Sequence, residues 1–332
     1  MKDAALERAT AEWRAAGEPV AEAVLVRTQH SSPRRPGARL RVDGAGRMAG
    51  GVSMGCVEND LREHLLALLA GKRGPGMVHY GRAFAESLEV GLSCGGEIDV
   101  WLRVLPEEVP SAPEGRSVWC LELGGAGREF YWQPGEAPPE ALPGLEGRLE
   151  ALVRAGGSWT GVDAGGTGWF LEGVAPEPRV VVVGASPIAV ALSALAARAG
   201  WRVAVVDPRR EWARAERFPD AEAVIHEWPE EGLATVGAGP ADAVAVLAHD
   251  EKLDVPALAA ALRAGCGYVG LLGSRGTQEA RKAALAADGF GPDALSRIRG
   301  PIGMKELGGV EPEEIAVGIL AELVKFRRGR LG

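Results

Sequence analysis

The feature that most constrains the fold is an uncharged stretch at residues 180–197, VVVVGASPIAVALSALAA. It is just long enough to suggest a membrane-spanning helix. However, Gly184 and Pro187 lie where a run of valines gives way to a run of alanine and leucine. This change is typical of a buried parallel strand that passes into a helix through a tight turn. We therefore interpret the stretch as part of a folded core and not as a membrane span.

The chain after residue 179 continues the same alternation. Strand-like runs such as WRVAVVD and AVAVLAHD are followed by helix-like runs such as VPALAAALRAG and PEEIAVGILAEL. Strands that alternate with helices at this spacing predict βαβ units on a parallel sheet. The sequence therefore predicts an α/β domain over residues 179–332, in which helices flank a parallel sheet.

Two clusters of proline and glycine, at residues 106–115 and 133–147, divide the preceding part of the chain. We predict a first domain at residues 1–105. We also predict a connecting segment at residues 106–178, in which SVWCLEL and EFYWQ form short strands. In the first domain, three leucines share one face of a predicted helix, and IDVWLRV alternates as a half-buried strand does.

Gly184 begins a motif, Gly-Ala-Ser-Pro-Ile-Ala, at the place of the G-x-G-x-x-G/A turn of Rossmann domains. Asp207 ends the next predicted strand, where an acidic residue would bind a ribose hydroxyl. Ser186 replaces the glycine that lets a pyrophosphate approach, and Pro187 lacks an N–H donor. The motif therefore predicts a Rossmann-like fold more strongly than it predicts binding of NAD(P).

Arg209 and Arg210 follow this acidic residue closely. Guanidinium groups at this position could favour a 2′-phosphate on the ligand. We interpret them instead as solvated loop charges.

His249 and Asp250 follow an apolar strand, at the edge where open α/β sheets bind ligands. We interpret His249 as a functional residue, whereas Asp254, just before Val-Pro, fits a helix N-cap. The glycine-rich loop at residues 270–276 lies at the same predicted edge, where its N–H groups and Arg275 could hold an anion.

Composition limits the function classes. A net charge of −8 provides no field that would attract nucleic acid or an anionic membrane. Four cysteines in 332 residues do not form a disulfide framework, and the N-terminus lacks a secretory apolar region. We therefore expect a cytoplasmic protein with reduced thiols.

The four cysteines divide into two kinds. Cys120 and Cys266 lie in apolar runs and are predicted to be core residues. Cys56 and Cys94 lie in glycine-flanked turns, where a helix N-terminus would favour the thiolate and the glycines leave room for a bulky ligand. The glycines could serve tight turns alone, but the two sites together favour function. No CxxC spacing or paired histidine indicates a zinc site.

Several ordered motifs carry a family resemblance. In the first domain they are SSPRRPGARL, GGVSMGCVEND and GLSCGGEID, and in the last they are FPDAEAV, AHDEKLD, YVGLLGSR, GPIGM and PEEIAVGILAEL. On these motifs the chain resembles the XdhC/CoxI family, the accessory factors of xanthine dehydrogenase and carbon monoxide dehydrogenase maturation. The resemblance covers nearly everything outside residues 106–178. It implies an N-terminal α+β domain of XdhC/CoxI type ahead of the C-terminal Rossmann-like domain.

The resemblance implies a chaperone for the molybdenum cofactor (molybdopterin). Such a protein protects the cofactor from oxidation, supports its sulfuration by a cysteine desulfurase, and delivers it to the apo-enzyme of a molybdenum hydroxylase. The resemblance also implies a homodimer and a maturation factor, as opposed to a turnover enzyme.

Residue roles follow from the same resemblance. Cys56 and Cys94 would be molybdenum ligands or transient persulfide carriers, because a soft thiolate suits the metal of molybdopterin. The loop at residues 32–35, or the one at 270–276, would hold its phosphate. The catalytic candidates are Cys56, Cys94, His249 and Asp250. The cofactor-binding candidates are Ser32, Arg34, Arg35, Ser53, Gly55, Glu58, Gly95, Gly96, Gly184, Ser186, Asp207, Gly273, Ser274 and Arg275.

The chain departs from the family pattern at three places. Met54 stands where the family has glycine, and Ser186 and Pro187 replace a Gly-His pair. The segment PIGMKELGG is one residue longer than its family counterpart before PEE.

Two alternatives from other classes stay open. One is an NAD(P)-dependent oxidoreductase in which Cys56 and Cys94 form a redox pair and His249 is the acid/base. The other is a structural subunit of a hydroxylase complex that has no ligand of its own.

Overall fold

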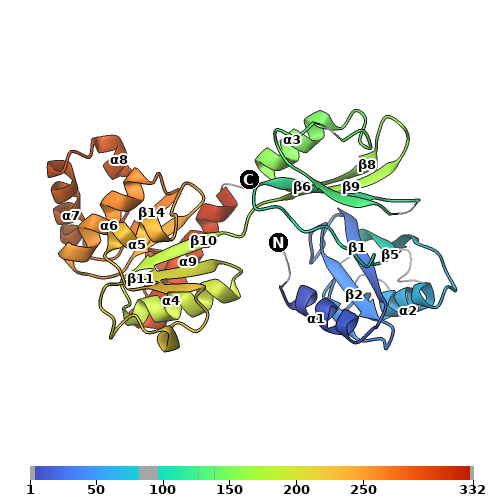
Figure 1. The fold of residues 1–332 in the computed structure, drawn as a ribbon, viewed down its shortest axis with the longest axis horizontal. Helices are drawn as coiled ribbons and strands as arrows, with labels where there is room; N and C mark the ends of the chain where they lie inside the picture. The colour runs from blue at the N-terminus through green and yellow to red at the C-terminus, as the bar shows by residue number, and fades with distance from the viewer. Residues whose placement is uncertain (1–3, 82–95, 126, 138, 330–332) are drawn as a thin grey trace. The chain divides into compact units, whose positions relative to one another are not determined.

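The computed structural model describes residues 4–81, 96–125, 127–137 and 139–329 (Figure 1). The chain divides into two compact units, and the boundary falls between Pro176 and Glu177. Among the described residues, no helix combines the length and apolar character needed to cross a bilayer.

The first unit begins with an antiparallel sheet of order β3-β2-β1-β5-β4. Helix α2 covers one face of this sheet, because Leu61, Leu65 and Leu68 pack on β1 and β5, as the predicted helix face requires. The elements are α1 (Ala4–Ala15), β1 (Val20–Gln29), β2 (Arg39–Asp43), β3 (Met48–Gly50), α2 (Glu58–Leu69), β4 (Gly76–Tyr80) and β5 (Glu97–Val104).

Residues 106–178 form more than a connection. Their strands build a second antiparallel sheet of order β7-β6-β9-β8, and α3 packs on one face of it. On the other face, Trp119 and Phe170 pack against Val24 and Trp101 of the first sheet. Strand β5 is therefore buried on both faces, and its expected half-burial is wrong. The elements are β6 (Ser117–Glu122), β7 (Glu129–Trp132), α3 (Glu146–Ala155), β8 (Ser158–Val162) and β9 (Gly168–Val174).

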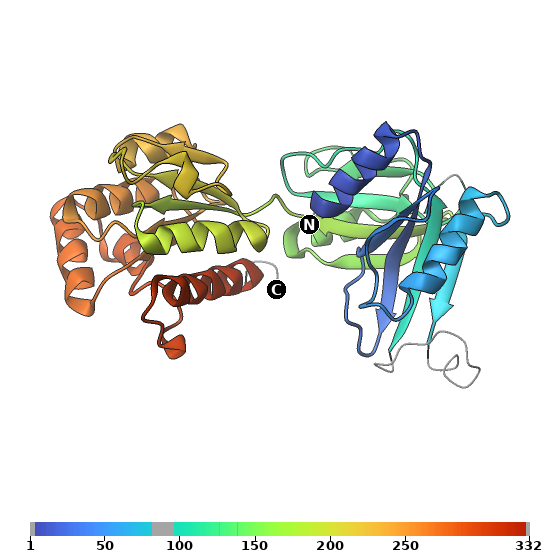
Figure 2. The ribbon, with the colours of Figure 1, turned by 90° about the horizontal axis from the view of Figure 1, so that it is seen from below.

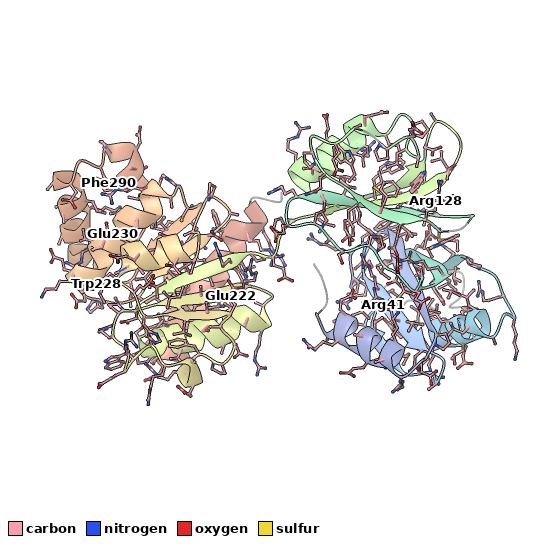
Figure 3. All side chains as sticks on the ribbon, in the orientation of Figure 1. Arg41, Arg128, Glu222, Trp228, Glu230 and Phe290 are labelled. Atoms are coloured by element: carbon pink, nitrogen blue, oxygen red, sulfur yellow. The ribbon has the colours of Figure 1, made fainter. Side chains whose placement is uncertain are left out.

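A buried charge network lies in the first unit. Glu22 on β1 is fully buried and accepts hydrogen bonds from Arg41 Nε at 2.8 Å and from Arg103 Nη2 at 2.6 Å. Figure 3 labels Arg41 in the first unit. Arg103 also donates to Glu129 of the second sheet at 3.1 Å. Burial alone would raise the pKa of Glu22, but the charges of Arg103 and Arg41 outweigh it and lower this pKa to about 2.

The second unit confirms the predicted Rossmann-like architecture. Its sheet is parallel and has the order β12-β11-β10-β13-β14-β15, so the topological switch point lies between β10 and β13. The strands are β10 (Arg179–Val183), β11 (Arg202–Val206), β12 (Ala223–Ile225), β13 (Ala243–Val246), β14 (Tyr268–Leu271) and β15 (Ile298–Arg299).

Helices cover both faces of this sheet. Figure 2 shows α4, in yellow-green, beside the dark red α9 on one face, and both contribute to the same apolar cluster. Helices α5, α6 and α7 contribute to the cluster on the other face. The helices are α4 (Pro187–Arg198), α5 (Pro229–Thr235), α6 (Glu251–Arg263), α7 (Arg275–Ala287), α8 (Pro292–Ser296) and α9 (Pro312–Gly329), with short 3-10 turns η2 (Ala215–Arg217) and η3 (Lys305–Leu307).

Candidate functional site

The predicted thiol Cys56 lies in a tight turn immediately before α2. Val52 and Val57 on either side of it are fully buried and fix the turn to the core, whereas Met54 is 81% exposed. Gly55 has a φ of 101°, which favours glycine. Cys56 itself is half-buried. The turn therefore presents the Cys56 region at the surface from a rigid base.

Glu58, the first residue of α2, folds back onto this turn. Its carboxylate accepts hydrogen bonds from the N–H groups of Ser53 at 2.6 Å, Gly55 at 2.9 Å and Val52 at 3.1 Å, and from Ser53 Oγ at 2.5 Å. Burial would raise the pKa of Glu58, but the hydrogen bonds from Ser53 and Gly55 lower it overall. The Glu58 carboxylate therefore holds the turn together by accepting hydrogen bonds from its backbone.

Substituting Glu58 tests this internal role. We expect Glu58→Gln to cost about 2 kcal/mol, because glutamine cannot accept the same set of hydrogen bonds and a charged acceptor is lost. Urea unfolding measures this cost. The control is Glu63→Gln on the same helix, since Glu63 has a side chain that is 71% exposed and pairs only with Arg62 among the described residues. Equal unfolding midpoints for the two variants would contradict the role of Glu58.

The loop that carries Ser32, Arg34 and Arg35 approaches the same turn. A Cβ atom added to Gly51 would lie 3.9 Å from Arg34 Nη2, so this guanidinium lies beside the Cys56 turn. Ser32 Oγ donates to the backbone oxygen of Arg34 at 2.8 Å and shapes the loop, and Arg35 is exposed. Of these three predicted residues, the structure places the Arg34 guanidinium near Gly51, at the start of the turn that carries Cys56.

Gly96 follows the segment that carries Cys94 and Gly95, and those two residues lie outside the described part of the chain. A Cβ atom at Gly96 would collide with the backbone of Ser31. Glycine is therefore required where β5 begins beside the loop of Ser32.

In the second unit, the turn after β10 uses its predicted residues internally. Ser186 is the N-cap of α4 and accepts from the N–H of Ala189 at 3.3 Å. Both carboxylate oxygens of Asp207 are engaged, by the N–H of Ala185 at 2.7 Å and by Arg209. Burial would raise the pKa of Asp207, but these hydrogen bonds lower it overall. An engaged carboxylate does not favour the NAD(P)-dependent alternative.

His249 and Asp250 lie at the switch point. A Cβ atom at Gly184, which has a φ of 99°, would collide with the backbone of Ala248, so the two loops are in contact. His249 has a φ of 56°, which is uncommon for a residue other than glycine. Both side chains are exposed.

The predicted N-cap of α6 is wrong. The cap is Asp250, whose carboxylate accepts from the N–H of Lys252 at 3.0 Å, and the helix continues through Pro256. Asp254 is instead fully buried in the first turn and pairs with Arg281 at 3.3 Å. Burial raises the pKa of Asp254. Pattern alone could not distinguish the two aspartates, because both precede helix-forming residues.

The loop after β14 places Gly273, Ser274 and Arg275 one strand from the switch point. Ser274 caps α7 by accepting from the N–H of Thr277 at 3.3 Å, and Arg275 is exposed. Gly273 has a φ of 135°. The structure therefore collects the second group of predicted residues at one edge of the sheet.

The other cysteines are core residues, as predicted. Cys120 and Cys266 are fully buried, and burial raises their pKa values to about 12 and about 11. Neither presents a reactive thiolate. Among the described residues, no cluster of three or more His, Cys, Asp or Glu side chains could hold a metal ion.

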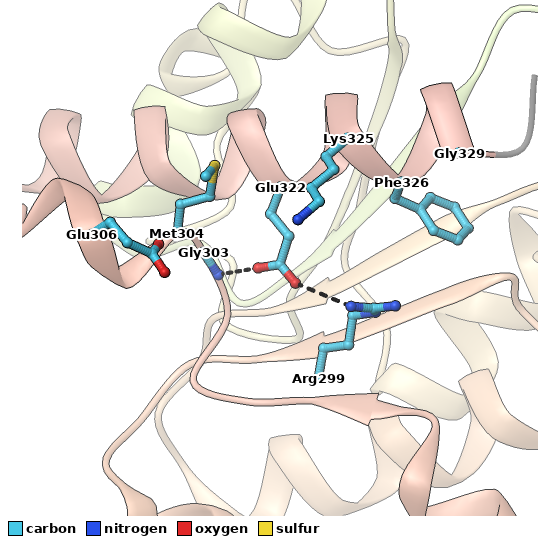
Figure 4. A pocket seen from close by; sticks show the side chains of 8 residues that line it. All are labelled: Arg299, Gly303, Met304, Glu306, Glu322, Lys325, Phe326 and Gly329. Carbon is cyan, nitrogen blue, oxygen red and sulfur yellow. Dashed lines mark hydrogen bonds and ion pairs between the residues drawn. The ribbon is translucent and has the colours of Figure 1, made fainter. Parts of the chain in front are cut away.

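A cavity of about 610 Å³ lies between β15 and α9 (Figure 4). Glu322 crosses its floor, where it accepts from the N–H of Gly303 at 2.5 Å and lies 3.9 Å from Arg299. Sequence reasoning assigned no site role to the lining residues, which are Arg299, Gly303, Met304, Glu306, Glu322, Lys325, Phe326 and Gly329.

Comparison with known families gives two matches. Residues 180–323 match the model of the XdhC Rossmann domain, and residues 13–81 match the model of the XdhC and CoxI family. The first match spans the parallel sheet of the second unit, and the other spans the Cys56 turn and α2.

Relatives match along most of the chain. A probable xanthine dehydrogenase subunit from Bacillus subtilis is 28% identical over 325 residues, which is 92% of each protein. The molybdenum cofactor insertion chaperone PaoD from Escherichia coli is 26% identical over 304 residues, which is 91% of this chain and 82% of PaoD. A crystal structure of a xanthine dehydrogenase from Bacillus halodurans has a TM-score of 0.74 at 22% identity and covers 97% of this chain and 96% of its own. That likeness shows the fold.

Proposed function

Because the chain belongs to the XdhC and CoxI family, we propose that it carries the molybdenum cofactor and inserts it into a xanthine dehydrogenase-type enzyme. The observation that carries this proposal is the likeness to a named cofactor insertion chaperone over 91% of the chain. In this role the cofactor is cargo, so the chain binds it, shields it and releases it.

The Cys56 turn has the chemistry that this cargo requires. A thiolate is a soft ligand that suits molybdenum, and Arg34, whose Nη2 lies near Gly51 at the start of the turn, can pair with the phosphate of molybdopterin. Cys94 is the second proposed thiol. We further propose that sulfide from a cysteine desulfurase reaches the cofactor while it is bound here, and that the chain acts as a homodimer in the cytoplasm.

Purification from a molybdate-replete host tests the proposal. The full chain should retain molybdopterin and molybdenum, measured by pterin fluorescence after oxidation and by elemental analysis. Absence of both from protein purified without oxygen would contradict a carrier.

Co-expression with a molybdenum hydroxylase distinguishes the carrier role from that of a structural subunit. We expect a carrier to bind the apo-enzyme and to leave the mature complex, whereas a structural component should co-purify with the mature enzyme at a fixed ratio. Size-exclusion chromatography of both enzyme forms gives the answer.

A further inference from the structure

An exposed tryptophan lies near two guanidinium groups at the carboxyl edge of the parallel sheet in the second unit. Trp212 is 48% exposed. The guanidinium carbon of Arg217 lies 5.5 Å from the centre of a Trp212 ring, and that of Arg209 lies 6.0 Å away. Both distances fall within the range of cation–π contacts, about 6 Å.

Both arginines are held in place by bonds to the fold. Arg209 donates through Nε and Nη2 to the buried carboxylate of Asp207. Arg217 donates through Nη1 to the backbone oxygens of Ala185, in the turn after β10, and of Trp212. Arg217 therefore links the turn after β10 to the backbone of Trp212.

These bonds leave donors unused. In the described part of the chain, Arg209 Nη1 and both Nε and Nη2 of Arg217 have no protein acceptor. Arginine N–H groups arranged in this way bind phosphate oxygens well. Because Asp207 is already engaged, the edge offers cations in place of the carboxylate that would bind a free ribose diol.

The loop after β13 adds a carboxylate, Asp250, to this edge of the sheet. The pKa of Arg209 is raised, mainly by its hydrogen bonds to Asp207 and also by the negative charges of Asp207 and Asp250. One oxygen of Asp250 caps α6, and the exposed carboxylate can also accept from a ring N–H. Cations, an aromatic ring and an acceptor are thus all found at the carboxyl edge of this sheet.

We propose that Arg209, Trp212 and Arg217 form a platform that binds a planar heteroaromatic ring bearing a phosphate ester. The ring stacks on Trp212, and the phosphate pairs with the two arginines. A nucleotide and a phosphorylated pterin both have this chemistry. The platform belongs to the second unit and the thiol site to the first, and the platform does not require that the proposed cargo role be correct.

Calorimetric titration of the full chain tests the platform. The probes are AMP, GMP, CMP and adenosine 2′,5′-bisphosphate, each beside its unphosphorylated nucleoside, and isolated molybdopterin added to the Cys56→Ala variant. At least one phosphorylated probe should bind, and removing its phosphate should weaken binding about tenfold or more, because charge-assisted bonds are lost. Binding of molybdopterin alone identifies a pterin ligand and also supports the platform.

Two matched pairs of variants locate the binding. Trp212→Leu should weaken the bound probe about tenfold, as expected for loss of base stacking. Trp228→Leu should not, although Trp228 is 54% exposed in the same unit. Arg217→Gln should weaken it, whereas Arg198→Gln, at the far end of α4, should not. Binding that Trp212→Leu leaves unchanged, or binding of no probe in the panel, overturns the proposal.

Discussion

Replacing Glu22 by glutamine is expected to destabilise the first unit by about 3–5 kcal/mol, the range for breaking a buried ion pair. The substitution keeps the volume of the side chain but removes its charge. Arg41 and Arg103, which are 1% and 4% exposed, would then lack their shared carboxylate. Arg41 keeps its ion pair with Glu7, and Arg103 keeps its ion pair with Glu129. The loss is therefore large, but neither guanidinium loses every carboxylate partner.

The pH dependence of this effect has a definite sign. The pKa of Glu22 is about 2 in the folded protein and ordinarily 4.5. A lowered carboxyl pKa stabilises the fold above pH 4.5, and this stabilisation, about 3 kcal/mol, is lost as the pH falls from 4.5 toward 2. The difference in stability between wild type and Glu22→Gln should therefore shrink over that window.

Urea unfolding at pH 7 and pH 3, with hydrogen exchange of the β1 and β2 peptides, isolates the first unit. The control is Glu222→Gln in the second unit, which breaks a surface pair with Arg202 (Figure 3). It should cost about 1 kcal/mol or less. A Glu22→Gln variant as stable as this control at pH 7 would show that the network contributes little.

This network could not be predicted from the sequence. Glu22 is the one charged residue in the apolar run VAEAVLV, and the run itself does not indicate what would pair with a buried carboxylate. Its face of β1 is covered because Trp119 and Phe170 of the second sheet pack against Val24 on the same face. Pairing of β6 with β9 joins residues some 50 positions apart, Trp119 with Glu172 among them, and no local pattern reports such contacts.

The second unit was predictable because its signals are local. The valines of β10 end just before Gly184, and α4 begins at Pro187, as the change in the sequence indicates. For the candidate site residues, the sequence did not reveal the hydrogen-bond partners that the structure gives them. Ser186 and Asp250 are helix caps, and Glu58 accepts hydrogen bonds from its own turn. In each case the side chain bonds to backbone N–H groups whose positions are defined only once the turn has folded.

Under the proposed function, replacing Cys56 by alanine is expected to lower the molybdopterin bound to the purified chain about tenfold or more, because the proposed metal–thiolate bond is lost. The fold should survive. The turn is held by Val52 and Val57, which are fully buried, and by the carboxylate of Glu58. Cys56 is only half-buried, so its truncation should cost about 1 kcal/mol. Circular dichroism and bound-pterin fluorescence on the same preparation measure both quantities.

The matched control is Cys266→Ala, which removes a thiol that the core encloses. Cys266 is fully buried and its pKa is raised to about 11, so it presents no thiolate to a ligand. This variant should lose more stability than Cys56→Ala and leave molybdopterin binding unchanged, whereas Cys56→Ala should lose that binding at a cost of about 1 kcal/mol in stability. If Cys56→Ala retains molybdopterin at the wild-type ratio, the half-buried thiol does not bind the cargo, and the role falls to groups other than Cys56.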